Sequence, residues 1–553
     1  MSSSSESTIT VGDDLPLDIA DVEVRPATAR VWAKRRTAFR LGQGMLAALL
    51  VVPFGLLSNA TGTTDNLRTA YAGELLSHPA VVLPVGADPL IVESGEYFVP
   101  ESRADASDRI VSIPFYRLRS TAAKPAAPIF LVAGGPGVSG IEDVHNNKDW
   151  RRMALLYRGI ADVIVFDQRG AGRSRPKLDC PQRVSLPLNT PMTLESYSTQ
   201  LREQSIACRR MWEERGADLT AYNTAESAAD IDALRVALGY NKIALVGGSY
   251  GSHLSLAVLR QFPKSIERAV LHGVVGPDHI YDLPSEVLAA LARLAADAER
   301  SEHIGPHVPP GGLIQALVTV LQRLERAPLK ITVQHRGEPV EITLGKYDIQ
   351  RLAFSGARDR EKLDWPARII AMYHGDFSSV ASYAIYARNE NIDSAMHTMM
   401  DCSSGLSKRR LRRLRSDPVE AAAAEIMGDV NIERFATCAA WGSKDLGKEF
   451  RSNVVSSIPT LIIQGSWDVL TPVANGNQIA ADMGNAHVVR VEGGTHRVLY
   501  DLVAEWQPAE KLLKDFLVGK EIAPPHIVQL PAPSFSRLDT VSPRVARIKR
   551  HEG

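Results

Sequence analysis

The most restrictive feature of this sequence is the stretch KIALVGGSYGSHLSLAVLRQFP, residues 242–263. An apolar run, typical of a strand that is buried on both faces, breaks at Gly247. A helical pattern begins directly after Ser249 and stops at Pro263. A strand that passes into a helix over so few residues places the serine on a sharp turn. This order of elements predicts an α/β fold with a parallel sheet.

Five further apolar runs have the same strand-like character and predict the rest of the sheet. Between residues 276 and 457 the pattern is instead mostly helical, apart from a hairpin-like stretch that turns at Arg336-Gly337. An insertion of this length is large enough to form a domain of its own. The five apolar runs are 128–134, 162–168, 268–275, 459–465 and 487–493.

We therefore expect five segments along the chain. Residues 1–62 form a polar, disordered N-terminus with a targeting segment. The core of the fold lies in two parts, at 63–275 and 458–520, and residues 276–457 form the inserted domain. Residues 521–553 form a proline-rich tail that we expect to run over the surface.

A basic stretch and an apolar stretch follow one another near the N-terminus. Four basic residues occur in WAKRRTAFR, and 13 residues without a strongly polar side chain run from Met45 to Leu57. Small residues at Ser58-Asn59-Ala60, and again at Ala70-Tyr71-Ala72, suit cleavage of a signal peptide. The pattern predicts an exported protein whose signal is cleaved. The alternatives are a retained membrane anchor over residues 41–57 and a buried segment.

The four cysteines, Cys180, Cys208, Cys402 and Cys438, agree with export. An even number in an exported chain indicates two disulfides, for which three pairings are possible. The simplest pairing joins sequence neighbours, 180 with 208 and 402 with 438, and each bridge would stabilise the fold by ~3 kcal/mol. Four buried thiols are the alternative.

The charge of the chain is balanced, with 63 basic and 63 acidic residues. Such a balance gives no electrostatic reason to expect a nucleic-acid partner. One strongly basic stretch, KRRLRRLR at 408–415, could contact an anionic lipid or an acidic protein. A run of this kind is more often the exposed face of a helix, and we expect that here.

Ser249 lies in the pattern G-x-S-x-G, which suits a nucleophile. A serine hydroxyl reacts only when a base removes its proton and hydrogen-bond donors hold the oxyanion that forms. The glycines allow the sharp turn, and the following helix brings the N–H of Tyr250 near the developing charge. A second donor is expected from Gly134 and Gly135, in the glycine-rich loop after the strand at 128–134. A turn with only a structural role is the alternative for that loop.

The acid and the base of a catalytic triad should follow the nucleophile in that order, each after a strand. Asp468 comes just after the strand at 459–465, and His496 comes in the loop after the last strand. Asp468 would orient the imidazole, and His496 would take the proton from the serine. Three other histidines fit less well. His253 lies inside the nucleophile's own helix, and His145 and His272 precede the acid.

Four motifs together resemble the proline iminopeptidase and tripeptidyl aminopeptidase family of α/β hydrolases. They are GGPGVSG at 134–140, VIVFDQRGAGRS at 163–174, GGSYG at 247–251, and PTLIIQGSWDVLTP with GGTH further on. The similarity runs from about Glu93 to Val518. It implies an α/β-hydrolase sheet with helices on both faces and a large, mainly helical cap inserted before the strand that carries the acid. It also implies a peptide substrate bound by its N-terminus, no metal, and export.

Two positions depart from the family's pattern. The family often has a histidine where this chain has Ala133, just before the glycine-rich loop. Relatives also often carry an acidic residue directly after a cap cysteine, where Ser403 follows Cys402 here. An aminopeptidase needs a carboxylate to bind the substrate's ammonium group. The candidates for that role are Asp401, Asp393 and Glu390.

The sequence thus predicts an exported serine hydrolase that works without a cofactor or a metal. The favoured activity is that of an aminopeptidase, which releases N-terminal residues or tripeptides through an acyl-enzyme on Ser249. An esterase or amidase with the same triad is the first alternative, and a binding protein on a silent hydrolase fold is the second. The stretch GGPG lacks the spacing of a dinucleotide-binding loop.

Overall fold

The computed structural model describes residues 70–83, 89–104, 108–428 and 430–545. The predicted signal segment, the possible anchor at 41–57 and the cleavage site at 58–60 lie outside these residues. None of the helices in the described ranges combines the length and the apolar character that a membrane span needs.

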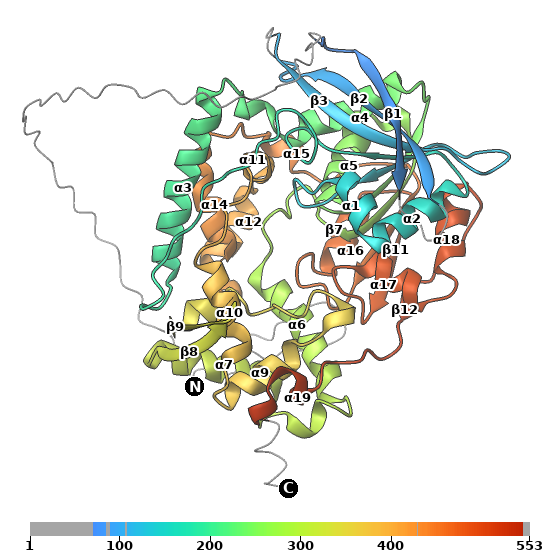
Figure 1. The fold of residues 1–553 in the computed structure, drawn as a ribbon. Helices are drawn as coiled ribbons and strands as arrows, with labels where there is room; N and C mark the ends of the chain where they lie inside the picture. The colour runs from blue at the N-terminus through green and yellow to red at the C-terminus, as the bar shows by residue number, and fades with distance from the viewer. Residues whose placement is uncertain (1–69, 84–88, 105–107, 429, 546–553) are drawn as a thin grey trace, which may run out of the picture.

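A ten-stranded sheet forms the centre of the described structure, in the order β1-β2-β3-β5-β4-β6-β7-β10-β11-β12 (Figure 1). The strands from β5 to β12 in this order pair in parallel, whereas β1, β2, β3 and β5 pair antiparallel. The strands are β1 Leu75–Leu83, β2 Leu90–Pro100, β3 Ile110–Leu118, β4 Ile129–Val132, β5 Val163–Phe166, β6 Ile243–Ser249, β7 Ile266–Val274, β10 Thr460–Gly465, β11 Ala486–Glu492 and β12 Ile527–Gln529.

All six strands predicted from apolar runs are present, as β4, β5, β6, β7, β10 and β11. Most of them are buried along their whole length or nearly so, which explains why they read as uninterrupted apolar runs. The sequence analysis missed β1, β2 and β3. These strands form the antiparallel end of the sheet. Most residues of β1 are exposed, and polar residues interrupt the apolar pattern of β2 and of β3, although β3 is mostly buried.

Helices cover both faces of the sheet, as expected (Figure 1). On one face α4 and α5 bury side chains such as Ile231 and Leu254. On the other face α2, α17 and α18 bury Met153, Leu502 and Leu513. The helices of the core are α1 Gly140–Asn146, α2 Lys148–Arg158, α4 Thr224–Ala237, α5 Tyr250–Gln261, α16 Ala474–Ala480, α17 Val498–Glu505 and α18 Ala509–Leu517.

A second, mainly helical unit lies between β7 and β10 in the sequence, and we call it the cap. It has a buried cluster of its own, to which Leu291, Leu317 and Ile370 belong. Its only hairpin in the described part, β8 Leu329–His335 and β9 Glu338–Leu344, turns where the sequence predicted, at Arg336 and Gly337. The helices of the cap are α6 Pro284–Glu299, α7 Gly312–Arg326, α8 Lys346–Gln350, α9 Trp365–Tyr373, α10 Ser378–Ala387, α11 Ala395–Ser404, α12 Lys408–Ser416, α13 Pro418–Met427, α14 Val430–Trp441 and α15 Gly447–Phe450.

The segment between β5 and α4, which the sequence analysis assigned to the core, also packs on the cap. Its long helix α3 (Leu194–Glu214) lies beside α14 (Figure 1). The backbone N–H of Val184 and that of Leu186 donate to the carbonyl oxygens of Glu390 and Arg388. The cap is therefore built from two excursions of the chain rather than one.

Two disulfides hold this arrangement, and they join the cysteines that are nearest in sequence. Cys180 is bonded to Cys208, which ties the start of the first excursion to α3. Cys402 is bonded to Cys438, which ties α11 to α14. No free cysteine occurs in the described residues.

The proline-rich tail runs over the surface for much of its length, as expected, but it is also anchored at several buried positions. β12 pairs in parallel with β11 and extends the sheet, with Val528 buried. The chain then crosses to the cap, where Phe535, Leu538 and Val545 join the buried cluster, and it forms α19 (Leu538–Val541). Apolar side chains spaced between the prolines hold the tail in place because they reach both cores.

The basic stretch at 408–415 forms α12, and most of its charged side chains are exposed, as predicted. Arg410 is the exception. It is buried, and its Nε donates to the carbonyl oxygen of Tyr281 at 2.9 Å.

Candidate active site

Ser249 occupies the turn between β6 and α5, at the carboxyl end of the parallel strands. Its φ of 53° lies in the left-handed region, which a serine adopts rarely and which is found most often at functional sites. A Cβ on Gly247 would collide with the backbone oxygen of Gly251, and a Cβ on Gly251 would collide with that of Val132. The G-x-S-x-G pattern is therefore required by the close packing of this turn.

Asp468 and His496 lie within hydrogen-bond distance of each other. Nδ1 of His496 is 3.0 Å from Oδ2 of Asp468 and 3.1 Å from Oδ1. The hydroxyl of Thr471 donates to Oδ2 at 2.5 Å, and the backbone N–H groups of Leu470 and Thr471 donate to Oδ1 at 2.9 and 2.8 Å. The sequence analysis missed Thr471, although a hydroxyl three residues after the acid is a natural partner for it.

The environment of Asp468 keeps its carboxylate charged. The side chain is fully buried. Burial alone would raise the pKa of Asp468, but the charge of His496 and the hydrogen bonds from His496 and Thr471 together lower it below the ordinary value. A buried, ionised carboxylate beside Nδ1 fixes the tautomer in which Nε2 is able to accept a proton.

Ser249 and His496 line one cavity together. The hydroxyl of Ser249 makes no hydrogen bond within the described residues. The glycine-rich loop comes close to the serine, because a Cβ on Gly134 would lie 3.2 Å from the Cβ of Ser249. Gly135 and Tyr250 line a second cavity together with the same serine. The structure thus gathers all the predicted catalytic and oxyanion residues around Ser249.

The DQRG stretch at 167–170 holds the glycine-rich loop and the chain around Ala221 in place. Nε2 of Gln168 donates to the carbonyl oxygen of Ala133 at 2.8 Å, directly before the glycine-rich loop. Arg169 is fully buried, with Nε 2.7 Å from Oδ2 of Asp230 and Nη1 donating to the carbonyl oxygen of Ala221 at 2.8 Å. The sequence analysis used the stretch as a family marker, and the structure gives it a structural role.

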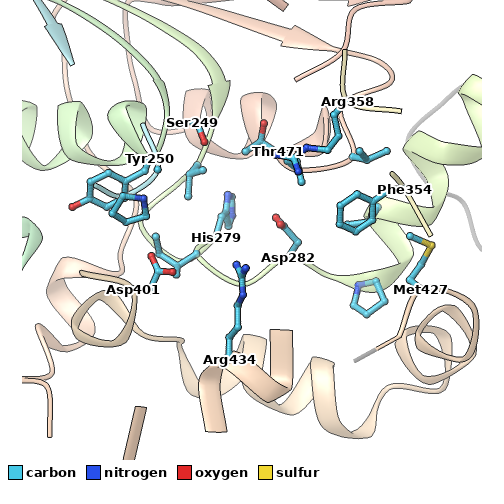
Figure 2. Close-up of a pocket in the computed structure, with 18 of the residues that line it drawn as sticks. Ser249, Tyr250, His279, Asp282, Phe354, Arg358, Asp401, Met427, Arg434 and Thr471 are labelled. Carbon is cyan, nitrogen blue, oxygen red and sulfur yellow. The ribbon is translucent and has the colours of Figure 1, made fainter. Parts of the chain in front are cut away.

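Two cavities meet at Ser249. The first has a volume of ≈ 340 Å³ and lies between the serine and the cap, so we call it the cap cavity (Figure 2). The second has a volume of ≈ 350 Å³, lies beside His496 against the sheet, and is the sheet cavity. Both are lined by Gly135, Ser249, Arg358 and Leu470. Further residues of the cap cavity include Tyr250, His279, Asp282, Asp401 and Arg434. Further residues of the sheet cavity include Leu131, Trp150, Met153, Tyr157, His272 and Leu499.

Of the three carboxylates that the sequence offered for binding an ammonium group, Asp401 alone lines the cap cavity. Its Oδ2 is 3.3 Å from Nε2 of His397. Asp393 does not line the cavity, and its Oδ2 is 3.9 Å from the same nitrogen and 4.0 Å from Nη2 of Arg434. The two aspartates and the two cations form one charged group under α11 and α14.

Glu390 is the wrong candidate, because its carboxylate serves another purpose. Its Oε1 accepts hydrogen bonds from the hydroxyl of Tyr197 at 2.6 Å and from Nη2 of Arg351 at 2.7 Å. Glu390 lines neither cavity. It holds α3 against the cap instead.

Asp282 is a carboxylate of the cap cavity that the sequence analysis missed. In Figure 2 its side chain lies near the middle of the view, between His279 and Phe354, with Asp401 on the other side of His279. Burial raises the pKa of Asp282 well above the ordinary value, so a cation that enters the cavity would favour its ionised form. Its place, in the loop after β7, was a usable signal, since ligands of open α/β sheets bind beyond the carboxyl ends of the strands.

The charged groups around Asp401 shift one another's pKa values toward the ionised forms. Burial alone would lower the pKa of His397, but Asp393 and Asp401 raise it above the ordinary value. The charge of Asp393 likewise raises the pKa of Arg434, whose side chain is 51% exposed. The cap cavity therefore holds fixed charges of both signs.

The competing histidines have other surroundings. His253 is buried in α5, with Nδ1 3.1 Å from a backbone oxygen and Nε2 3.0 Å from the hydroxyl of Ser404. His145 lies 3.2 Å from the hydroxyl of Tyr116. Burial lowers the pKa of His272 to about 3, so this ring is neutral at ordinary pH. The described residues contain no group of three or more His, Cys, Asp or Glu side chains that could hold a metal ion.

Comparison with known protein families agrees with the fold and with the order of the site residues. The model of the alpha/beta hydrolase fold matches residues 127–305, which carry the glycine-rich loop and Ser249. The model described as TAP-like protein matches residues 424–521, which carry Asp468 and His496. This chain is an α/β hydrolase.

Several known proteins are similar to this α/β hydrolase. The putative hydrolase YuaR of Escherichia coli is 26% identical over 71% of this chain and 78% of its own length. Serine protease Hip1 of Mycobacterium tuberculosis is 27% identical over 36% of this chain and 38% of its own. The tripeptidyl aminopeptidase of Streptomyces lividans is 29% identical over 34% of this chain and 36% of its own length. The alignments to the last two proteins thus span little more than a third of their lengths. The relatives place this hydrolase among serine peptidases and hydrolases.

Proposed function

We propose that this α/β hydrolase is a serine peptidase that releases residues from the free N-terminus of peptides through an acyl-enzyme on Ser249. In this proposal His496 accepts the proton of Ser249, whose oxygen attacks the scissile carbonyl carbon. The N–H groups of Tyr250 and Gly135 hold the oxyanion. His496 then protonates the leaving amine as the C–N bond breaks, and a water molecule hydrolyses the ester that remains.

The observation that carries the proposal is the position of Asp401 and Asp282 in the same cavity as the nucleophile. An ammonium group entering from water loses hydration, and only carboxylates at short range compensate for that loss. The cavity is small, ≈ 340 Å³, which suits one or a few residues before the scissile bond. A peptide with a blocked N-terminus would bring no cation to either carboxylate.

Export is part of the proposal. Two disulfides form and persist in oxidising compartments and are rare in the cytosol of most organisms. The relatives named as a tripeptidyl aminopeptidase and a serine protease support a peptidase activity for this chain. Oxidative refolding of the reduced protein, followed by thiol counting, tests whether both bridges form.

The experiment compares one aminoacyl or tripeptidyl anilide that has a free N-terminus with its N-acetylated form. We expect the free amine to be hydrolysed at least about 100-fold faster, because the acetylated form loses charge-assisted hydrogen bonds to the carboxylates of the cavity. Ser249→Ala should abolish hydrolysis of both. Asp401→Asn should reduce the ratio between the two substrates more than it reduces the rate on the acetylated one.

Two results would contradict this function. Equal rates on both anilides, or activity confined to simple esters, would make the protein an esterase or amidase that uses the same triad. Activity that survives in Ser249→Ala would show that the nucleophile lies elsewhere. Glu390→Gln is the matched control for Asp401→Asn, since this carboxylate lies outside the cavity and should leave the ratio unchanged.

A further inference from the structure

The sheet cavity is a second space beside the nucleophile, and the proposed attack on a peptide gives no role to its deep part. Its walls are mostly apolar and come from β4, α2 and α17, through residues such as Leu131, Met153 and Leu499. An apolar space of ≈ 350 Å³ is large enough for the side chain of a large apolar or aromatic residue.

One polar group lies in this apolar wall without a partner. The side chain of Tyr157 is 0% exposed, and its hydroxyl makes no hydrogen bond within the described residues. Nδ1 of His272, in the same cavity, is likewise without a partner there. The ring of Tyr157 adds apolar surface to this wall, and an apolar side chain that fills the cavity leaves its hydroxyl as it is in the free protein.

The chemistry of the triad decides which part of a substrate enters this cavity. His496 must give its proton to the leaving nitrogen, so that nitrogen has to lie within hydrogen-bond reach of the imidazole. His496 lines the sheet cavity and does not line the cap cavity. The residue that carries the leaving nitrogen therefore extends into the sheet cavity, while the acyl part occupies the cap cavity.

Arg358 stands where the two cavities meet. Its guanidinium makes no hydrogen bond and no ion pair with the described residues, and in Figure 2 it points toward Thr471, across the cavity from Asp401. Arg358 is exposed to water, and the partial burial that it has lowers the pKa of its guanidinium because no anion lies close to it. An arginine in this position is suited to a carboxylate that is brought by the substrate.

We infer that the sheet cavity is the subsite for the leaving group, and that this group is a single amino acid with a large apolar side chain and a free carboxylate. The side chain fills the cavity toward Tyr157, the nitrogen lies beside His496, and the carboxylate pairs with Arg358. The inference rests on the proposed peptidase function and adds a substrate class to it. That class is short peptides whose last peptide bond is the one that is cleaved.

The test uses peptides with one acyl part, the one that the anilide experiment selects. Each is followed by phenylalanine, by glycine or by phenylalanine amide, and kcat/KM is measured from release of the amine. We expect kcat/KM for the phenylalanine peptide to exceed that for the glycine peptide by about 10- to 100-fold, which corresponds to burying one large apolar side chain. We expect the free acid to exceed the amide by a similar factor, the value of a hydrogen bond between charged groups.

Two variants connect these preferences to the structure. Arg358→Gln should remove most of the preference for the acid over the amide, and the amide substrate corrects for any general effect of the variant on the site. Arg412→Gln is the matched control, since this exposed arginine of α12 lines neither cavity. Met153→Trp should reduce the preference for phenylalanine over glycine by filling the cavity, and thermal unfolding checks that the variant folds.

The inference is overturned if the wild-type protein hydrolyses the peptides but does not distinguish phenylalanine from glycine. It is also overturned if the acid and the amide are hydrolysed equally well. Failure of the peptidase function gives a different result, in which no peptide is hydrolysed but esters are. Acyl esters of phenyllactate and glycolate then replace the peptides, because they keep the carboxylate and the side chain of the leaving group, and the same two ratios decide.

Discussion

Replacing Thr471 by valine removes one hydroxyl from the buried carboxylate of Asp468 and nearly keeps the shape of the side chain. Asp468 accepts hydrogen bonds from two backbone N–H groups and from the hydroxyl of Thr471, and it lies 3.0 Å from His496. A hydrogen bond to a charged group contributes about 1.5–3 kcal/mol. We therefore expect Thr471→Val to lower the free energy of unfolding at neutral pH by about that amount. If the lower limit also applies in the transition state, kcat/KM falls by about tenfold.

The pH dependence expected for Thr471→Val follows from the lowered pKa of Asp468. The pKa of Asp468 is lowered in the folded protein, so its ionised form contributes stability above the pKa of the unfolded chain. That stability is lost as the pH falls through the folded pKa. In Thr471→Val the pKa of Asp468 rises, so we expect the acid side of the kcat/KM profile to move to higher pH. The difference in stability between wild type and variant should narrow in acid, where both carboxyls are protonated.

The assay is a profile of kcat/KM between about pH 2 and pH 8, with urea unfolding at both ends of the range, because the lowered pKa of Asp468 keeps the carboxylate ionised at about pH 4. Thr319→Val is the matched control, because the hydroxyl of Thr319 donates to the uncharged carbonyl oxygen of Gln315 at 2.8 Å. It should cost less than about 1 kcal/mol and leave the profile in place. The reasoning is refuted if Thr471→Val keeps the acid side of the profile where it is and loses the same stability at both pH values.

Three further predictions concern the surroundings of the site. Replacing both cysteines of one bridge, Cys402→Ser with Cys438→Ser, should lower the free energy of unfolding by about 3–4 kcal/mol, which is the closure entropy of a loop of 36 residues. The same double variant should raise KM for free-amine substrates, because α11 is held less firmly. Burial raises the pKa of Asp143 to about 6, so the wild type should lose stability from about pH 4 to pH 6 relative to Asp143→Asn, seen as a growing difference in Tm. Arg169→Met should cost about 3–5 kcal/mol in urea unfolding, because it removes one of the two arginines paired with the buried Asp230 and leaves the carbonyl oxygen of Ala221 without this donor. An unchanged unfolding curve would contradict the prediction for the cysteine pair or for Arg169→Met. A difference in Tm that stays constant with pH would contradict the prediction for Asp143→Asn.

Prediction from the sequence succeeded where a single stretch of chain contains its own signal. The central strands were found because burial on both faces forces an uninterrupted apolar run. Ser249, Asp468 and His496 were found because each follows such a strand, in an order that the chemistry requires. β1 to β3 gave no such signal. Most residues of β1 and β2 are at least partly exposed, and the buried β3 carries Ser112, Pro114 and Arg117 within its apolar pattern.

The cap carboxylates could not be resolved in the same way. Glu390, Asp393 and Asp401 are close together in the sequence, but α11 and the loop before it turn them in different directions. Asp401 faces the cavity, and Glu390 is held by an arginine and a tyrosine from other elements. Which of several acidic side chains meets a distant serine depends on long-range packing, and the sequence around each residue carries no record of it.

The path of the C-terminal segment has a mechanical consequence. After β12 the chain leaves the edge of the sheet and buries Phe535 and Leu538 among the helices of the cap. This segment works as a strap between the two halves, and the cap cannot swing away unless the strap is pulled loose from one of them. A cap that is tied in this way keeps the cap cavity at a fixed distance from Ser249, so the packing of both units limits the size of a molecule that can reach the serine.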